Sequence, residues 1–62
     1  MNSIFDLTLE ELESILVENG FKKFNATQVF EGIYKKRVTS FDEITNISKE
    51  LKAFLNNNYE LK

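Results

Sequence analysis

Hydrophobic residues recur at helical spacing in three stretches of the chain, and the first stretch predicts a helix over Leu9–Asn19. Thr8 and Glu11 stand three residues apart, the spacing of a reciprocal capping box at a helix amino terminus. Gly20 follows the stretch, where a residue in the left-handed conformation often ends a helix. The apolar face of this helix consists of Leu9, Leu12, Ile15 and Leu16.

The second stretch predicts a helix over Ala26–Lys36, joined to the first by residues Phe21–Phe24. Asn25 and Gln28 repeat the capping spacing, so we expect Asn25 to be the residue that caps this helix. The apolar face consists of Ala26, Val29, Phe30, Ile33 and Tyr34. The exposed face is expected to consist of Gln28, Glu31, Gly32, Lys35 and Lys36.

The third stretch is less regular and predicts one turn over Phe41–Ile44, followed by a helix over Lys49–Asn57. Ser40 and Ser48 are the expected caps of the turn and of the helix. The expected core residues of this region are Phe41, Ile44, Ile47, Leu51, Phe54, Leu55 and Tyr59. Because no stretch alternates like a strand, the pattern predicts an all-α fold, a small bundle of three helices and one short turn that forms a single domain over residues 1–62.

The composition removes most catalytic chemistry, because the chain contains no cysteine, histidine, proline or tryptophan. Thiolate-bound zinc, iron–sulfur ligation by this chain, cysteine nucleophiles and histidine-dependent triads are therefore excluded. A content of 42% hydrophobic and 29% charged residues is typical of a globular domain. The sequence shows no signal peptide or membrane span, so a cytoplasmic location is expected by default. A binding or structural module is favoured over a small independent enzyme.

The charge is unevenly distributed along the chain. Residues 1–21 carry five acidic residues and no basic one, whereas residues 22–37 carry five basic residues and one acidic residue. Lysine and arginine in this middle segment could displace counterions from a phosphate backbone, and a glutamine could bind a base edge or a sugar. A glycine on the same ridge would let a ligand backbone approach closely. The candidate RNA-binding residues are Lys22, Lys23, Gln28, Gly32, Lys35, Lys36 and Arg37.

Other interpretations of the polar and aromatic residues remain open. Lysines near the carboxyl end of a helix are favoured by the helix dipole alone. The glutamates of the first helix are expected on a solvated face, where nothing would raise a carboxylate pKa for acid–base catalysis. Tyr34 and Tyr59 lie in apolar stripes and are expected in the core, with the hydroxyl at its edge. No exposed aromatic residue suitable for stacking is expected beside the basic residues.

Five segments together resemble the amino-terminal accessory domain of a family of radical S-adenosylmethionine enzymes. The family methylates C2 of adenine in 23S ribosomal RNA and in transfer RNA. The segments that carry the resemblance are Phe5–Leu12, Gly20–Phe30, Ile33–Val38, Phe41–Ser48 and Leu51–Lys52. Each is a weak motif alone, but their order and spacing over nearly the whole chain are specific.

The resemblance implies that the chain is the front of a longer enzyme whose catalytic domain is absent. That domain would hold an iron–sulfur cluster and S-adenosylmethionine, whereas this chain would hold no cofactor and perform no catalysis alone. The resemblance also implies a helical unit of helix-hairpin-helix character that helps to hold structured RNA for its own catalytic domain. That RNA would be 23S ribosomal RNA, transfer RNA or both.

Two positions depart from the family pattern, which usually has arginine at the positions of Asn25 and Lys52. Asn25 lacks the guanidinium group that suits phosphate, so Lys22 and Lys23 could carry more of that role. A competing hypothesis is a helical module for protein interaction or interdomain docking, with Tyr59 and Leu61 as part of its apolar surface.

Overall fold

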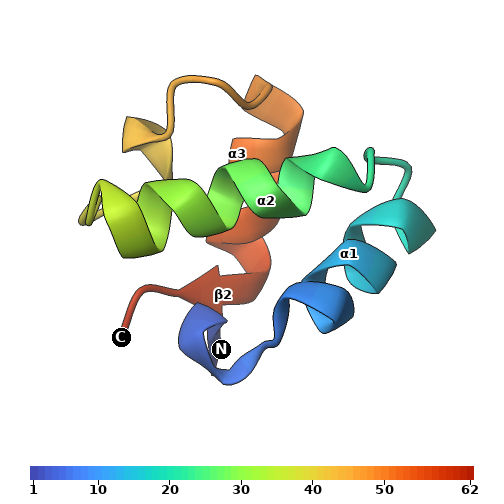
Figure 1. Ribbon diagram of the computed structural model, residues 1–62, viewed down its shortest axis with the longest axis horizontal. Coiled ribbons are helices and arrows are strands. Elements are labelled where there is room, and N and C mark those ends of the chain that lie inside the picture. Colours follow the sequence, from blue (N-terminus) through green and yellow to red (C-terminus); the bar gives the residue numbers. More distant parts are fainter.

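The computed structural model describes residues 1–62 as a small helical unit with both chain ends on the same side (Figure 1). The predicted helical bundle is confirmed, and a very short parallel strand pair is added to it. The elements in chain order are β1 (Asn2–Ser3), η1 (Ile4–Asp6), α1 (Leu9–Glu18), α2 (Phe24–Phe30), η2 (Glu31–Lys35), η3 (Phe41–Glu43), α3 (Lys49–Asn58) and β2 (Tyr59–Glu60).

Helix α1 begins as the sequence predicts. The Glu11 backbone N–H donates to the Thr8 hydroxyl at 3.1 Å, and the Thr8 backbone N–H donates to Glu11 Oε1 at 2.8 Å. These two bonds satisfy amide groups that a helix terminus would otherwise leave without partners. The helix ends before Gly20, which has a φ of +88° and provides the expected left-handed residue. The capping box and the terminating glycine are both confirmed.

Replacing Thr8 with alanine is expected to lower the free energy of unfolding by about 1 kcal/mol, because the Glu11 N–H loses its acceptor. The loss would appear as a lower midpoint in urea denaturation followed by circular dichroism. Thr45→Ala serves as a control, because Thr45 is also exposed and lies outside every helix. If the Thr8 and Thr45 variants unfold at the same midpoint as the parent, the capping box contributes nothing.

The second predicted helix divides into two forms. Helix α2 starts at Phe24, two residues earlier than expected, and continues directly into η2, a π-helix of five residues. The Lys36 N–H donates to the Glu31 carbonyl at 3.1 Å, a bond that spans five residues where an α-helix spans four. The sequence predicts a continuous α-helix here, and that part of the prediction is wrong. Such π-helical turns are rare and occur frequently at functional sites.

The third region follows the prediction, except that the Ser40 side chain forms no capping bond to the turn. The turn at Phe41–Glu43 forms a 3-10 helix, and α3 begins at Lys49 with Ser48 as its cap. The Leu51 N–H donates to the Ser48 hydroxyl at 3.1 Å. Before α3, the Thr39 hydroxyl donates to Glu43 Oε2 at 2.6 Å, and this bond lowers the pKa of the Glu43 carboxyl below its ordinary value. The stability that the bond provides is complete above the ordinary glutamate pKa and disappears as the pH falls through the lowered pKa.

The two ends of the chain pair as parallel strands, a feature that the sequence pattern does not predict. Asn2 lies opposite Tyr59, and Ser3 lies opposite Glu60. The Ser3 hydroxyl also donates to the backbone oxygen of Lys62. In Figure 1, β2 and the amino terminus lie side by side at the end of α3. The pair fixes both ends of the chain against the helical unit.

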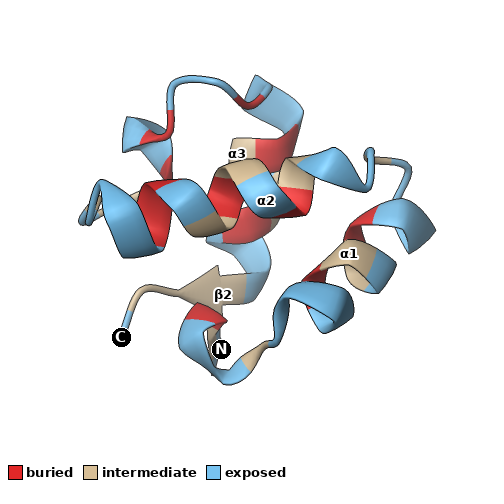
Figure 2. Cartoon of the chain, viewed as in Figure 1, coloured by how far each residue is buried: buried red, intermediate tan, exposed pale blue.

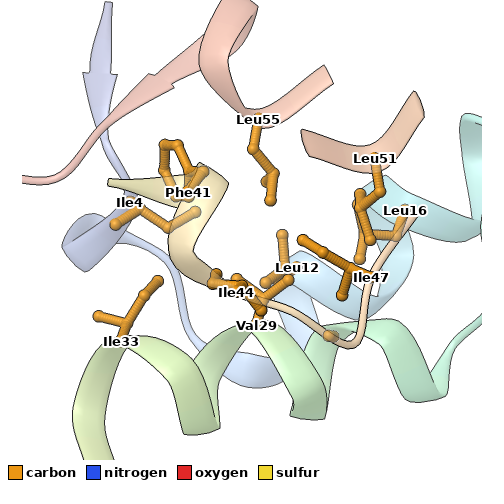
Figure 3. Close-up of a cluster of buried hydrophobic side chains, with 11 residues drawn as sticks. Ile4, Leu12, Leu16, Val29, Ile33, Phe41, Ile44, Ile47, Leu51 and Leu55 are labelled. Atoms are coloured by element: carbon orange, nitrogen blue, oxygen red, sulfur yellow. The ribbon is translucent and has the colours of Figure 1, made fainter. Parts of the chain in front are cut away.

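Every helical element contributes to one hydrophobic core. Figure 2 shows that the helices turn their buried positions inward and leave their outer faces exposed. The side chains in Figure 3 converge from η1, α1, α2, η2, α3 and the segment around η3. Phe54 and Tyr59, both expected core residues, are half-buried and pack against this cluster. The core consists of Ile4, Leu12, Leu16, Ala26, Val29, Ile33, Phe41, Ile44, Ile47, Leu51 and Leu55.

Candidate nucleic-acid interface

The structure places the predicted basic residues at opposite ends of one helical rod, which α2 and η2 form together. Lys22 and Lys23 precede α2, whereas Lys35 ends η2 and Lys36 and Arg37 follow it. The seven residues of α2 and the first four of η2 lie between the two groups. At about 1.5 Å per helical residue, the groups stand roughly 18 Å apart. All five cations are exposed, but they form two separate sites rather than one cluster.

The amino end of α2 has mixed charge. Lys23 lines a shallow concavity on the outer face of α1 together with three glutamates, Glu10, Glu13 and Glu18. These carboxylates would repel a phosphate approaching Lys23, because like-charged groups raise the energy of a bound anion. The basic group that Lys22 and Lys23 form is therefore less suited to RNA than the sequence pattern indicates.

Asn25 does not cap α2, and this prediction is wrong. Lys23 is the capping position, and Asn25 is the second residue inside the helix. Its side-chain oxygen accepts the backbone N–H of Lys22 at 3.0 Å, and its Nδ2 donates to Gln28 Oε1 at 2.8 Å. The first bond occupies an amide group that could otherwise face a phosphate. The second engages the side-chain oxygen of Gln28. Gln28 is half-buried and keeps its amide NH₂ for a ligand.

Gly32 is buried and does not lie on an exposed ridge, so the expectation that it admits a ligand backbone is wrong. A Cβ atom at this position would lie 2.9 Å from Ile44 Cγ1, closer than such atoms normally approach. Gly32 therefore lets the segment that carries Ile44 pack directly on η2. Its role is close packing inside the domain, which accounts for a glycine in a helix where alanine is otherwise favoured.

The carboxyl end of η2 carries three consecutive exposed cations, Lys35, Lys36 and Arg37. Arg37 has a φ of +55°, in the left-handed region that residues other than glycine rarely occupy. The Val38 N–H donates to the Gly32 carbonyl at 3.1 Å and closes the turn around Arg37. A left-handed arginine costs roughly 1 to 2 kcal/mol relative to a right-handed conformation. Glycine would avoid this cost, so Arg37 occupies this turn against the backbone preference.

The structure shows an exposed aromatic group near these cations that the sequence does not predict. Tyr34 is 50% exposed although its position in the apolar stripe predicts a core residue. Its ring packs edge to face against Phe30, with centroids 5.2 Å apart, and against Phe5, with centroids 5.6 Å apart. Phe5 is itself 44% exposed. The sequence signal for this group was the position of Tyr34 at the margin of its stripe, directly before Lys35.

A second exposed aromatic residue, Phe24, lies at the start of α2 and is 61% exposed. The expectation that no exposed aromatic residue accompanies the basic segments is therefore wrong at both ends of the rod. Tyr59 and Leu61, the expected docking residues, are half-buried and pack against the core. The large apolar side chains left exposed are instead Met1, Phe5, Leu9, Val17, Phe24 and Tyr34.

None of the helices combines the length and the apolar character that crossing a membrane would require.

Comparison with known proteins relates this arrangement to RNA-modifying enzymes. Residues 2–61 match the family described as the ribosomal RNA large subunit methyltransferase N-terminal domain. The probable dual-specificity RNA methyltransferase RlmN of Bacillus licheniformis is 54% identical over 59 residues, which are 95% of this chain and 16% of that protein. The protein of the same name from Streptococcus thermophilus is 56% identical over 57 residues, 92% of this chain and 15% of that protein.

A similar fold occurs in a radical SAM methyltransferase from Sphaerobacter thermophilus, whose crystal structure superposes with a TM-score of 0.92. That protein is 32% identical in sequence, and the match covers 100% of this chain and 18% of the other. The chain thus spans about one sixth of the length of the curated relatives it matches.

Proposed function

Because the chain belongs to the family of ribosomal RNA large subunit methyltransferase N-terminal domains, we propose that it is an accessory domain that holds RNA for a catalytic domain. The reaction would be methylation of adenine C2 in 23S ribosomal RNA and transfer RNA by a radical S-adenosylmethionine mechanism. The relatives named above support this proposal, since their names describe RNA methyltransferases and a radical SAM methyltransferase. The full-length protein would then act in the cytoplasm.

The chemistry of methyl transfer would lie outside this chain. The chain has no cysteine, and it has no group of three acidic residues placed to hold a metal ion. The residues of this chain do not fit an iron–sulfur cluster, because cysteine thiolates bind the irons of such clusters. The cluster and S-adenosylmethionine would belong to the catalytic domain, and the contribution of this chain would be to bind and position the RNA.

The observation that carries the proposal is the exposed basic turn, Lys35, Lys36 and Arg37, at the end of η2. Lysine and arginine side chains displace condensed counterions when they contact phosphates, so their affinity for RNA depends strongly on salt. Phosphate contacts of this kind orient the RNA and do not select its sequence. The acidic outer face of α1 limits this surface to the carboxyl end of the rod.

The double substitution Lys35→Glu and Lys36→Glu tests the proposal. We expect it to weaken binding of the 62-residue chain to an RNA stem-loop and to reduce the log–log salt slope by about 2, roughly one unit for each lost phosphate contact. The measurement is fluorescence anisotropy at a series of salt concentrations. Lys49→Glu with Lys62→Glu is the matched control, because both lysines are exposed and the same four units of charge change elsewhere.

Arg37→Gly provides a second test that loss of folding cannot mimic. The substitution removes one cation and gives the left-handed position its preferred residue, so the chain should be no less stable while its affinity for RNA falls. If the Lys35 and Lys36 variant binds RNA as its control does, this turn does not hold RNA. Docking on another domain, through exposed side chains such as Val17 and Phe24, would then be the better proposal.

A further inference from the structure

The exposed ring of Tyr34 is the feature of this surface that phosphate binding leaves unexplained. A tyrosine that served only the core would bury its ring, but Tyr34 is 50% exposed. Two edge-to-face contacts hold the ring, one from Phe30 in α2 and one from Phe5 in η1, with interplanar angles of 73° and 79°. Tyr34 is therefore an exposed residue whose ring already has two aromatic contacts before any ligand arrives.

We infer that Tyr34 is a platform on which one unpaired base of the bound RNA stacks, while Lys35, Lys36 and Arg37 contact the adjoining phosphates. The inference rests on the proposed function and adds one specific contact, between the Tyr34 ring and an unpaired base in a loop, a bulge or an end. Base stacking on an aromatic side chain contributes about 1 to 3 kcal/mol per base. Because the ring is already held by its neighbours, little side-chain entropy is lost when a base stacks on it.

Charge favours a base over an apolar protein surface as the occupant. Three exposed cations, Lys35, Lys36 and Arg37, extend from the same end of η2 as Tyr34. An apolar partner covering this end would have to remove water from every cation that it also covered, without compensation. A nucleotide supplies both interactions, since its base offers a flat π face and its phosphate offers the opposite charge. Paired bases inside a duplex have no free face, so stacking requires an unpaired base.

Phe24 is the natural comparison on the same chain. It is more exposed than Tyr34, at 61%, and also lies beside two lysines. However, Lys23 shares its concavity with Glu10, Glu13 and Glu18, which repel phosphate. A base stacked on Phe24 would therefore lack the phosphate contacts available beside Tyr34, and we assign the platform to Tyr34 alone.

The experiment compares two RNAs with equal numbers of phosphates, a hairpin with an unpaired loop and a blunt duplex. Tyr34→Leu should weaken hairpin binding by roughly 5- to 150-fold, the range that corresponds to one lost stacking contact, and should leave duplex binding unchanged. Tyr34→Phe keeps the ring and should bind the hairpin as the parent does. Phe24→Leu is the matched control and should not change the preference for the hairpin.

A spectroscopic measurement detects stacking without altering Tyr34. The chain has two tyrosines and no tryptophan, so in the Tyr59→Phe variant Tyr34 is the single strong ultraviolet emitter. We expect the hairpin, and not the duplex, to quench this emission. This measurement also covers the case in which Tyr34→Leu does not fold.

Three results would overturn the assignment. The first is equal quenching by hairpin and duplex. The second is that Tyr34→Leu weakens binding of hairpin and duplex equally, and the third is that Phe24→Leu weakens hairpin binding as much as Tyr34→Leu does. Failure of the proposed function looks different, because then neither RNA binds and Lys35→Glu with Lys36→Glu has no effect. The experiments can thus reject base stacking on Tyr34 and still support phosphate binding by Lys35, Lys36 and Arg37.

Discussion

Replacing Leu12 with alanine is expected to lower the free energy of unfolding by about 2 to 5 kcal/mol. Leu12 lies in α1 with no exposed surface, and its side chain points into the shared core in Figure 3. Alanine would leave a cavity among side chains from several elements, none of which can close it without moving its own backbone. A domain of this length is stabilised by only roughly 3 to 9 kcal/mol, so the substitution should remove a large fraction of the total stability.

Urea denaturation followed by circular dichroism would measure this loss. Val17→Ala is the matched control, because Val17 lies in the same helix and is 54% exposed. Alanine has the higher helix propensity, so the Val17 variant should stay within about 0.5 kcal/mol of the parent. Equal midpoints for the Leu12 and Val17 variants would show that α1 does not contribute to the core as described.

Replacing Gly32 with valine is expected to destabilise the domain by about 1 to 3 kcal/mol through overpacking. The new Cβ would lie 2.9 Å from Ile44 Cγ1, 3.3 Å from its Cδ1 and 3.4 Å from its Cγ2. Ile44 is 3% exposed and packed on all sides, so its side chain has little space to move. Valine would thus force η2 away from the segment that carries Ile44.

A double-mutant cycle identifies this contact as the cause. Ile44→Ala removes the three atoms that the new side chain would meet, so Gly32→Val should cost less in that background, with a coupling energy of about 0.5 to 3 kcal/mol. Gly20→Ala is the contrasting glycine: nothing lies within 4 Å of its added Cβ, and its cost comes from a φ of +88°. Ile44→Ala should not relieve that cost. Additive effects for Gly32 and Ile44 would refute the close-packing role.

The features that could be predicted from the sequence are those decided by neighbouring residues. The Thr8 and Glu11 bonds and the Ser48 bond span three residues each, so spacing alone identifies them. The apolar stripes likewise identify Leu12 and Leu51, because helical spacing decides which side chains share a face. Local rules therefore account for α1, α3 and most of the core.

Other features depend on contacts between distant segments. The π-helix of η2 is one of them, since no residue spacing in the sequence distinguishes it from a continuous α-helix. Gly32 is buried because Ile44 packs against it, and sequence spacing does not contain that contact. Tyr34 and Phe5 meet because the amino-terminal segment folds back onto the rod.

The cap of α2 illustrates a choice between two local solutions. Asparagine followed by glutamine three residues later has the spacing of a capping pair, yet the helix starts before Asn25. The side chain instead bonds to the backbone N–H three residues upstream, the bond that glutamate provides in α1. Asparagine suits both positions, so the pattern indicates a helix start nearby without fixing which residue it is.

The parallel pairing of β1 with β2 has a consequence for the order in which the domain forms. It joins Asn2 to Tyr59 and thereby closes a loop of almost the entire chain. Closing so long a loop before the helices pack would cost entropy with little enthalpy in return, so the pair should form late during folding. In the native state it should be the first part to open, and its amide hydrogens should exchange with solvent long before those of α1 and α3.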